Sequence, residues 1–479
     1  MSDSHVRNAT TTALWLDRLP QQPHRDPVTG NTNCDVAIVG GGFSGLWTAW
    51  YLRRLDPTLR IQIIEKHFCG YGASGRNGGW AVGEIAGSMA SYAKRSSHDE
   101  ALRQVRALFD AVDEIGRETD AAGIDCDYQK GGCIRLARNG PQAKRQRDEV
   151  EHEHSHGLTE ADLRLLTPDE ARSHLNATDV QSGIFFEHCA ALDPAKLVVG
   201  LAERLEADGV AIAEGTAVSA IVTRPPGATG PAGANKVVTE HGTVTADVVI
   251  RATEAYTRDI ADSKLDLLPI YSLMIATEPL PADVMAEIGL ADRPTFADDR
   301  FMVIYGQRTA DDRLAFGGRG VPYLFGSRIA ESAELHEPSH ELIRSTLVEM
   351  LPILGDMGDL GVEITHRWGG VLGIPRNWVP GLRFDRREGF GVLGGYVGEG
   401  VAAANLAGRT MAELIAGEQT PRTSLPWVGV RARRWEPEPF RWLGVRGSRA
   451  VLTRADDYEY ASDKPASWQY RLSRLLRGG

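Results

Sequence analysis

Cysteine is scarce and scattered in this sequence. The 479 residues include five cysteines, and no two of them form a C-x-x-C motif. An odd number of dispersed thiols does not fit a disulfide framework, and the spacing of a zinc site or a redox pair is missing. We therefore expect no metal site and a protein that stays reduced in the cytoplasm.

Long apolar runs and an excess of basic residues are also missing. No apolar run reaches the ~20 residues that a membrane span needs, and residues 1–33 are polar, without the apolar core of a secretory signal. The formal net charge of −11 argues against a general nucleic-acid binder, which normally carries a basic surface. The apolar content of 42% is ordinary for a globular enzyme of two or three domain-sized units.

A glycine-rich motif follows the first predicted strand. Residues 40–45 have the sequence GGGFSG, which matches G-x-G-x-x-G. The motif lies between an apolar run at 34–39, which predicts a strand buried on both faces, and a predicted helix at 44–55. A further strand is predicted at 60–65, so that the segment forms a βαβ unit. In this context the motif indicates a dinucleotide-binding fold.

The residue types in this unit have separate roles in binding a dinucleotide. Gly40 permits the tight turn, Gly42 lets the backbone approach a pyrophosphate, and Gly45 lets the helix pack closely against the sheet. The helix N-terminus offers free N–H groups and a partial positive charge to phosphates. Glu65, at the end of the second strand, can accept hydrogen bonds from ribose hydroxyls.

A second glycine-rich segment helps to decide which dinucleotide is bound. Residues 70–79, GYGASGRNGG, come soon after Glu65, and their backbone can run along the rest of a long cofactor. No second G-x-G-x-x-G with a strand and a helix around it appears later. The second glycine-rich segment favours FAD, with an enzyme that uses only a nicotinamide dinucleotide as a distant alternative. The missing second motif argues against a flavin monooxygenase, because those enzymes usually need a further nicotinamide site.

The rest of the chain predicts a second domain. Alternating strand patterns run through residues 269–363, whereas buried strands of the parallel type return at 244–252 and 390–394. We expect a Rossmann-like α/β nucleotide-binding domain and an α+β substrate domain built on a mostly antiparallel sheet. The predicted division is 1–33 as an N-terminal lead-in, 34–95, 183–265 and 361–430 as the discontinuous nucleotide-binding domain, 96–182 and 266–360 as the substrate domain, and 431–479 as a C-terminal extension.

The C-terminal extension is rich in arginine and tryptophan. Residues 468–477, WQYRLSRLLR, predict a basic amphipathic helix. Such a helix docks on the body of the protein in one interpretation, and contacts a membrane surface or a partner in the other.

Eight stretches carry a resemblance to a known family. They include DVAIVGGGFSGLWTAWYL at 35–52, IEKHFCGYGASGRNGGW at 64–80, HRWGGVLGIPRNWVPGL at 366–382 and GGYVGEGVAAANLAGR at 394–409. With these motifs in this order, the sequence resembles the D-amino-acid-oxidase-like (DAO) family of FAD-dependent oxidoreductases. The GASGRNGG form is most similar to the gamma-glutamylputrescine oxidase-like branch.

The resemblance implies FAD as the cofactor. Some relatives attach FAD through a cysteine near the stretch 368–375, and this stretch has none, so noncovalent binding is expected. The residues that the resemblance assigns to FAD are Gly40, Gly42, Phe43, Ser44, Gly45, Glu65 and Lys66 for the ADP half, Ser74, Arg76, Asn77 and Gly78 along the pyrophosphate and flavin, Val218 near the adenine, Ala252 and Thr253 under the cofactor, and Gly398, Gly400 and Val401 beside the flavin ring.

Five residues are candidates for the substrate side. Glu399 lies where relatives often have histidine, in a loop without a basic residue, and its carboxylate can attract a cationic amine. Arg319 and Arg376 can each hold an anion through bidentate pairing, or serve as structural ion-pair residues. Trp80 and Tyr396 adjoin flavin-contact stretches and can line the pocket. The missing loop cation shifts the expected substrate toward amines or polyamine-like molecules.

The resemblance implies the oxidation of a C–N bond in an amine or amino acid. Hydride transfer to flavin N5 would give an imine that hydrolyses, with O2 reduced to H2O2 and no protein nucleophile required. Two alternatives stay open. The enzyme could be a dehydrogenase of the same fold that passes electrons to a quinone or a carrier protein, or the chain could be a flavin-binding subunit without catalysis.

Overall fold

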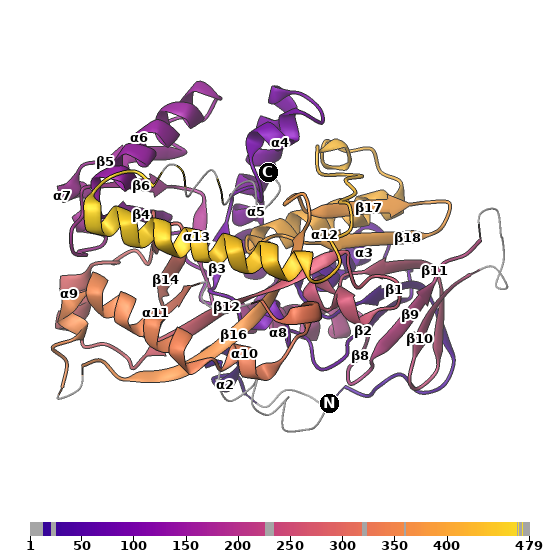
Figure 1. Cartoon of the computed structure of the whole chain (residues 1–479). Coiled ribbons are helices and arrows are strands. Elements are labelled where there is room, and N and C mark those ends of the chain that lie inside the picture. Colours follow the sequence, from indigo (N-terminus) through magenta and orange to yellow (C-terminus); the bar gives the residue numbers. More distant parts are fainter. Residues whose placement is uncertain are drawn as a thin grey trace.

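Two large sheets organise the protein. The computed structural model describes residues 13–20, 25–225, 234–318, 323–358 and 361–466, with the single positions 468 and 472. These residues form two eight-stranded sheets and a two-stranded sheet, with helices packed around them (Figure 1). In this part of the chain no helix is both long and apolar enough to cross a membrane.

The first sheet is parallel at its centre, as the βαβ pattern predicts. Strand β1 lies between β2 and β11 and runs parallel to both. Its alternate side chains are buried on both faces, which explains its nearly continuous apolar sequence. The strands are β17 (Gly381–Asp385), β18 (Phe390–Gly394), β11 (Thr243–Arg251), β1 (Thr32–Val39), β2 (Ile61–Ile64) and β8 (Ala211–Ala213) in spatial order, with β10 (Asn235–Thr239) paired to β11 and β9 (Val218–Val222) paired to β10.

One face of this sheet is covered by closely packed helices. Helix α3 (Phe43–Leu55) follows β1, and α12 (Gly400–Ala416) packs along it. A Cβ atom on Gly408 would lie 2.6 Å from the Trp47 Cβ atom, so only glycine permits this approach. The other helices of this layer are α8 (Pro194–Ala207), which contacts α3, and α5 (His98–Ala122), which contacts α12 and the short α4 (Met89–Ala93).

The second sheet is mostly antiparallel, as the sequence predicts. Its longest pairing joins β12 to β16, and the parallel pair β13–β4 departs from the antiparallel pattern. Side chains on one face of β12 pack against α11. The spatial order is β16 (Ile364–Pro375), β12 (Leu267–Thr277), β15 (Leu314–Gly318), β14 (Ile304–Arg308), β13 (Thr295–Asp298), β4 (Cys133–Ala137), β6 (Ser182–Phe186) and β5 (Leu163–Leu166), and the separate two-stranded sheet pairs β3 (Trp80–Val82) with β7 (Cys189–Ala191).

Shorter elements complete the second domain and the connections. The remaining α-helices are α2 (Leu14–Asp17), α6 (Gly140–Ser155), α7 (Pro168–His174), α9 (Ala282–Ile288), α10 (Glu331–Glu334) and α11 (Glu337–Met350). The 3₁₀ turns are η1 (Ala73–Gly75), η3 (Glu254–Asp259), η4 (Phe325–Ser327), η5 (Pro352–Leu354) and η6 (Arg422–Ser424).

Two strand pairings and the packing of one helix differ from the sequence-based division. Strands β6 and β16 pair in the second sheet, although the division assigned residues 183–265 and 361–430 to the nucleotide-binding domain. Helix α5 packs against α12 in the core of the first domain, although residues 96–182 were assigned to the substrate domain. A single sequence shows which segments are strands or helices, but not which sheet or core each of them joins.

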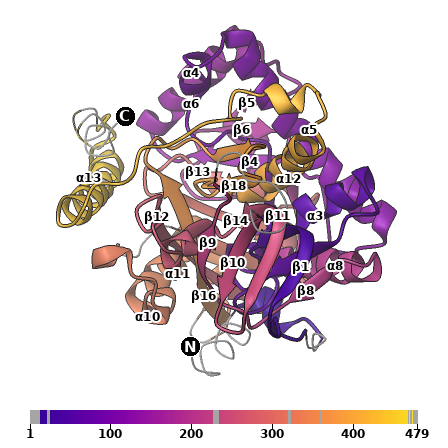
Figure 2. The same cartoon turned by 90° about the vertical axis from the view of Figure 1, so that its right-hand side faces the viewer.

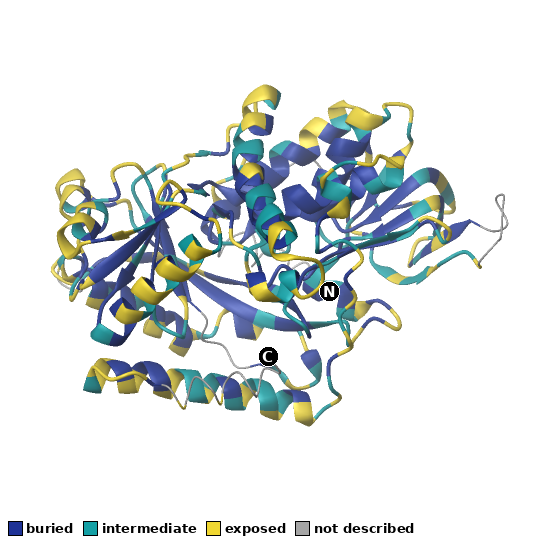
Figure 3. Ribbon diagram, turned by 90° about the horizontal axis from the view of Figure 1, so that it is seen from above, coloured by how far each residue is buried: buried dark blue, intermediate teal, exposed yellow. Residues whose placement is uncertain are grey.

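The C-terminal extension forms a long helix on the outside of the protein. Helix α13 (Phe440–Ser462) lies across the front of Figure 1 and is seen near one edge of the molecule in Figure 2. Exposed and buried residues alternate along it (Figure 3). The helix predicted at 468–477 lies almost entirely outside the described residues.

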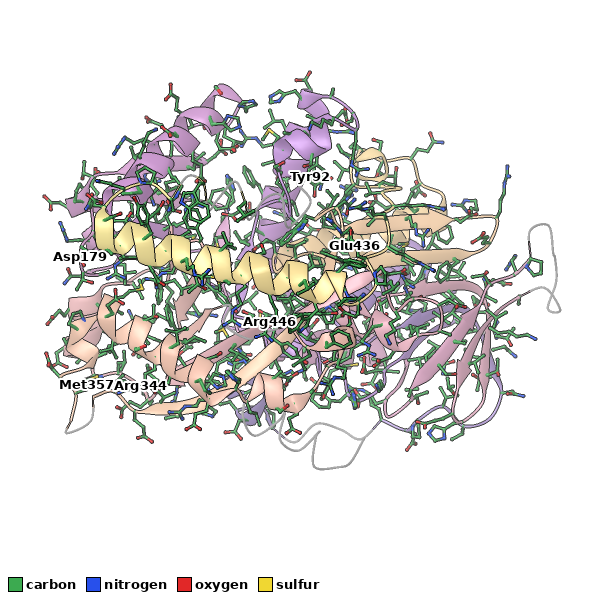
Figure 4. The ribbon with its side chains drawn as sticks, in the orientation of Figure 1. Tyr92, Asp179, Arg344, Met357, Glu436 and Arg446 are labelled. Carbon is green, nitrogen blue, oxygen red and sulfur yellow. The ribbon has the colours of Figure 1, made fainter. Side chains whose placement is uncertain are left out.

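Polar contacts fix α13 to the body at both ends. Before the helix begins, Trp435 Nε1 donates a hydrogen bond to Ile374 O at 2.7 Å, and Glu436, labelled in Figure 4, pairs with Arg376 at 3.0 Å. Beyond its last turn, Asp463 accepts a hydrogen bond of 2.7 Å from the N–H of Gly140, the first residue of α6.

Asp456 holds the loop before β14 from the middle of α13. Its two carboxylate oxygens accept hydrogen bonds from the N–H groups of Phe301, at 2.7 Å, and Met302, at 2.8 Å. Burial is the largest influence on this carboxyl and raises its pKa to about 6. The extension therefore supports a loop of the second domain through a carboxylate whose charge is disfavoured by its surroundings.

Because burial raises the pKa of Asp456, the stability of an Asp456→Asn variant relative to wild type should increase with pH. A raised pKa means that the folded protein binds a proton more tightly than the unfolded chain, so wild-type stability falls as the pH rises from about 4 to about 6. Asparagine resembles the protonated carboxyl and does not titrate. The melting temperature of the variant relative to wild type should therefore rise from about pH 4 to about pH 7. The corresponding change in the difference between their free energies of unfolding is at most about 3 kcal/mol.

The exposed neighbour Asp457 provides the matched control. Asp457→Asn should keep a constant difference from wild type over the same pH range. A difference between Asp456→Asn and wild type that stays constant, or falls with pH, would contradict the account.

Candidate functional site

A cavity of about 470 Å³ lies at the carboxyl ends of β1, β2 and β11. Crevices at this edge of a parallel sheet are the usual binding place for nucleotides. The N-terminal residues of α3 and of α12 both line the cavity. Two helix N-termini, each with a partial positive charge, therefore border one space.

The glycine turn between β1 and α3 requires glycine for two different reasons. Gly40 has a φ of +113°, and a Cβ atom there would lie 2.5 Å from Ala252 O. A Cβ atom on Gly45 would lie 2.1 Å from Gly40 O, so the first turn of α3 can close against the strand only without a side chain. Beside Gly42, the corresponding space is occupied by Ser74 Oγ at 2.8 Å.

The second glycine-rich segment is fixed to the turn and to the second domain. Ser74 Oγ accepts a hydrogen bond of 2.9 Å from the N–H of Phe43. The Asn77 amide bonds to the backbone of its own loop, and Asn77 O accepts a hydrogen bond from Trp15 Nε1 at 2.8 Å. Gln307, in strand β14, donates a hydrogen bond of 2.7 Å from Nε2 to Gly78 O. The backbone of residues 73–79 is therefore held in place along the cavity.

One end of the cavity carries the predicted ribose acid. The Glu65 carboxylate accepts hydrogen bonds from the N–H groups of Gly41, at 2.7 Å, and His67, at 2.9 Å. Burial raises the pKa of Glu65, although both hydrogen bonds act in the opposite direction. Lys66 forms an ion pair with Asp259 at 3.2 Å, and Val218 of β9 completes the wall at this end.

The other end is formed by the segment before α12. The Tyr396 hydroxyl and Ser44 Oγ share a hydrogen bond of 2.8 Å, which joins this segment to the start of α3. Glu254 accepts hydrogen bonds from the N–H groups of Gly395, at 2.5 Å, and Gly373, at 3.3 Å, and burial raises its pKa to about 7. Glu254, which follows β11 of the first sheet, is thereby bonded to β16 of the second sheet and to the segment that leads into α12.

A larger cavity of about 820 Å³ continues from this end toward the second domain. The two cavities share the lining residues Ala73, Asn77, Leu372, Gly398 and Val401. A molecule in the larger cavity can therefore reach one bound in the smaller.

Aromatic and carboxylate side chains face the larger cavity. Trp80 and Tyr305 meet edge to face with ring centroids 5.9 Å apart. Trp80 Nε1 donates to Gly306 O at 3.2 Å, and Tyr305 bonds to Ser272 Oγ at 2.7 Å, so both rings are fixed by their polar ends. Glu399, the N-cap residue of α12, lines the same space.

The residues of the smaller cavity fit a dinucleotide. The turn at Gly40 and the helix N-termini suit phosphates, and Glu65 suits ribose hydroxyls. Among the predicted cofactor residues, those that line the smaller cavity are Gly40, Gly42, Phe43, Ser44, Glu65, Lys66, Ser74, Asn77, Val218, Ala252, Thr253, Gly398, Gly400 and Val401.

Three predicted cofactor residues lie elsewhere. Gly45 packs behind the turn rather than on the cavity wall. Arg76 and Gly78 line the larger cavity. The buried Arg76 guanidinium pairs with Glu334 of α10 at 2.6 Å and lies 3.4 Å from the Tyr256 hydroxyl, so it joins the two domains. Its charge was predicted to lie along the cofactor but is compensated within the protein.

The predicted substrate residues are also divided between the two cavities and other parts of the protein. Glu399 and Trp80 line the larger cavity, whereas Tyr396 lines the smaller one. Arg376 lines neither of these cavities. It pairs with Glu436 and lies 5.0 Å from the ring centroid of Trp435, which is the arrangement of a structural ion pair, the alternative role given for it. Arg319 lies outside the described residues.

The sequence did not identify several residues that shape the site. Glu254, Tyr256 and Leu372 reach the smaller cavity from segments without a glycine-rich signature. Gln307 comes from β14, and Glu84 follows β3 of the separate two-stranded sheet. The position of Glu254, two residues after the predicted Ala252, was a local signal that could have drawn attention to it.

Comparison with known proteins assigns this arrangement to a family. The model of the family described as "DAO: FAD dependent oxidoreductase" matches residues 35–414. The chain is 30% identical to the gamma-glutamylputrescine oxidoreductase of Escherichia coli, over 82% of this chain and 86% of that one. It is also 30% identical to the probable oxidoreductase OrdL of Rhizobium meliloti, over 85% and 89% of the two chains.

Solved structures share the fold. Glycine oxidase from Geobacillus kaustophilus superposes with a TM-score of 0.67 at 19% identity, covering 84% of this chain and all (100%) of that one. L-proline dehydrogenase from P. horikoshii gives a TM-score of 0.64 at 19% identity, covering 84% of this chain and 96% of the other.

The turn geometry predicts the effect of Gly40→Ala on FAD binding. The new methyl group would overlap Ala252 O and displace the turn, and overpacking of this kind costs about 1–3 kcal/mol. The affinity of the apoprotein for FAD, measured by quenching of flavin fluorescence, should fall about tenfold to hundredfold.

Gly123→Ala is the matched control, because Gly123 also has a positive φ, +69°, and a Cβ atom there would meet no other atom within 4 Å. This variant should bind FAD as wild type does. Wild-type affinity in a folded Gly40→Ala protein, verified by circular dichroism, would show that the turn does not hold the cofactor.

Proposed function

We propose that this chain, which belongs to the DAO family of FAD-dependent oxidoreductases, oxidises a C–N bond of an amine or an amino acid. The observation that carries the proposal is the meeting of two cavities at Gly398 and Val401. One is built for a dinucleotide, and the other presents carboxylates and fixed aromatic rings. The name of the Escherichia coli relative, gamma-glutamylputrescine oxidoreductase, supports an amine as the substrate.

The residues of the smaller cavity would hold FAD without a covalent bond. The turn at Gly40 and the start of α3 would bind the pyrophosphate, and Glu65 would accept the ribose hydroxyls. The N-terminus of α12, which begins at Gly400, would favour negative charge on the pyrimidine side of the flavin.

The chemistry is divided between the cofactor and the protein. When bound, FAD would supply a two-electron acceptor for the hydride of the carbon next to nitrogen, with O2 as the proposed final acceptor and H2O2 as its product. The protein orients the substrate amine against the shared wall of the cavities and limits water at the reacting carbon through Trp80 and Tyr305. The imine product hydrolyses in water, so no protein nucleophile is needed.

Glu399 would attract the amine that is oxidised. It lines the larger cavity directly between Gly398 and Gly400, both of which line the smaller one. A carboxylate at this position raises the local concentration of a cationic amine and orients its nitrogen near the shared wall.

An anaerobic screen tests the proposed reaction. Amines and amino acids are mixed with the FAD-loaded protein without oxygen, and the flavin absorbance is followed. At least one primary or secondary amine should bleach the flavin, and admission of air should restore the absorbance and produce H2O2. If no amine or amino acid bleaches the flavin, the proposed oxidation is wrong. Bleaching without reoxidation in air would replace O2 by another acceptor.

Glu399→Gln should raise KM for the amine found in this screen. Loss of a charge-assisted contact of about 1.5–3 kcal/mol corresponds to an increase of about tenfold or more, with a smaller change in kcat. Glu418→Gln, an identical change at an exposed position just beyond α12, should leave KM as in wild type. Equal KM values for wild type and Glu399→Gln would remove Glu399 from substrate binding.

A further inference from the structure

The larger cavity contains more carboxylates than its own cations can compensate. Its three guanidinium groups are each engaged by a carboxylate. Arg300 pairs with Asp298 at 2.6 Å, and Arg76 pairs with Glu334 at 2.6 Å. Arg135 pairs with Glu149 at 2.5 Å and with Asp299 at 3.0 Å. An anionic substrate group would have to compete with these pairs, whereas a cation would not.

Glu84 and Glu153 are carboxylates of this cavity without a side-chain hydrogen bond or ion pair to the described residues, and Glu84 is the one that, like Glu399, acts on the buried thiol of Cys133. Glu84 follows β3 in the chain and lines the cavity, and it forms no hydrogen bond or ion pair with any residue that the structure describes. Its side chain is open to the cavity, but protein surrounds that space, and the resulting desolvation raises the pKa of Glu84. Arg135 lowers the pKa of Glu84. Glu149 and Asp299, however, form ion pairs with Arg135, and both of these carboxylates raise the pKa of Glu84.

The surroundings of Glu84 suit an alkyl chain that ends in a cation. Ile85, Met89, Val105 and Phe109 line the cavity beside it and offer apolar contacts. Glu399 lines the same cavity, and both carboxylates act electrostatically on the buried thiol of Cys133, whose pKa burial raises to about 12. One ammonium group bound at Glu399 would leave Glu84 without a cation in a poorly solvated space.

We propose that Glu84 is a specificity-determining residue, whose carboxylate binds a second cationic group of the substrate, separate from the amine that is oxidised. The inference rests on the proposed amine oxidation and identifies the substrate class as amines with two cationic groups joined by an apolar spacer. A bound ammonium would provide Glu84 with the hydrogen bonds and the opposite charge that the protein does not.

Binding to the oxidised, FAD-loaded protein tests this assignment without turnover. Putrescine, a straight-chain diamine, is compared with butylamine, which has the same carbon chain and one amino group. Each is titrated while the perturbation of the flavin absorbance is recorded. Wild type should bind putrescine about tenfold or more tightly than butylamine, because a charge-assisted hydrogen bond is added. Glu84→Gln should reduce this ratio about tenfold, and Glu84→Asp should give an intermediate value.

Glu151→Gln is the matched control, since Glu151 lies on the exposed side of α6 and the substitution removes the same charge. It should keep the wild-type ratio. The assignment is overturned if wild type binds both amines equally, or if Glu84→Gln keeps the wild-type ratio with normal flavin content. If the predicted binding pattern appears but no amine bleaches the flavin, the proposed oxidation fails and Glu84 remains a cation-binding residue.

Discussion

The close contact between the end of β1 and the start of α3 is the constraint on which the site depends. A glycine at position 40 turns the chain with positive φ, and a glycine at position 45 lets the helix close against the turn. This packing places the first residues of α3 on the wall of the cavity, where a helix N-terminus favours negative charge. The second glycine-rich segment is built around the same turn, because Ser74 bonds to the N–H of Phe43.

Elements outside the first sheet complete this arrangement by holding the backbone of residues 77–79 in place. Gln307 of β14 and Trp15 of α2 both bond to carbonyl groups in residues 77–79. Glu254 links β16 with the segment that leads into α12. The two cavities therefore share a wall whose position depends on both sheets.

Local features of the fold could be predicted from the sequence, whereas long-range pairings could not. The βαβ unit appears close to its predicted bounds, because apolar periodicity and glycine positions are local signals. Fewer than half of the residues that line the smaller cavity were predicted, and some of these, such as Val218 and Ala252, came from the family resemblance rather than from local signals. Arg376 was predicted to hold a substrate anion or to form a structural ion pair, and the sequence could not decide between these roles, because its partner Glu436 lies in the extension, which no local pattern connects to it.

The C-terminal extension supports the wall of the larger cavity, although it lies outside the part of the chain that matches the family. The family match ends at residue 414, and α13 begins well beyond it. Asp456 of α13 holds the N–H groups of Phe301 and Met302, and the adjacent Arg300 and Val303 line the larger cavity. One wall of the larger cavity is therefore supported by a segment beyond the family match, while the dinucleotide side lies within it.

The content of the smaller cavity is the most direct test of the account. Freshly purified protein is precipitated with acid, and the nucleotides in the supernatant and the pellet are quantified. The account predicts close to one FAD per chain, all of it in the supernatant. Protein without flavin that also takes up none on reconstitution, or protein that holds only a nicotinamide dinucleotide, would contradict it.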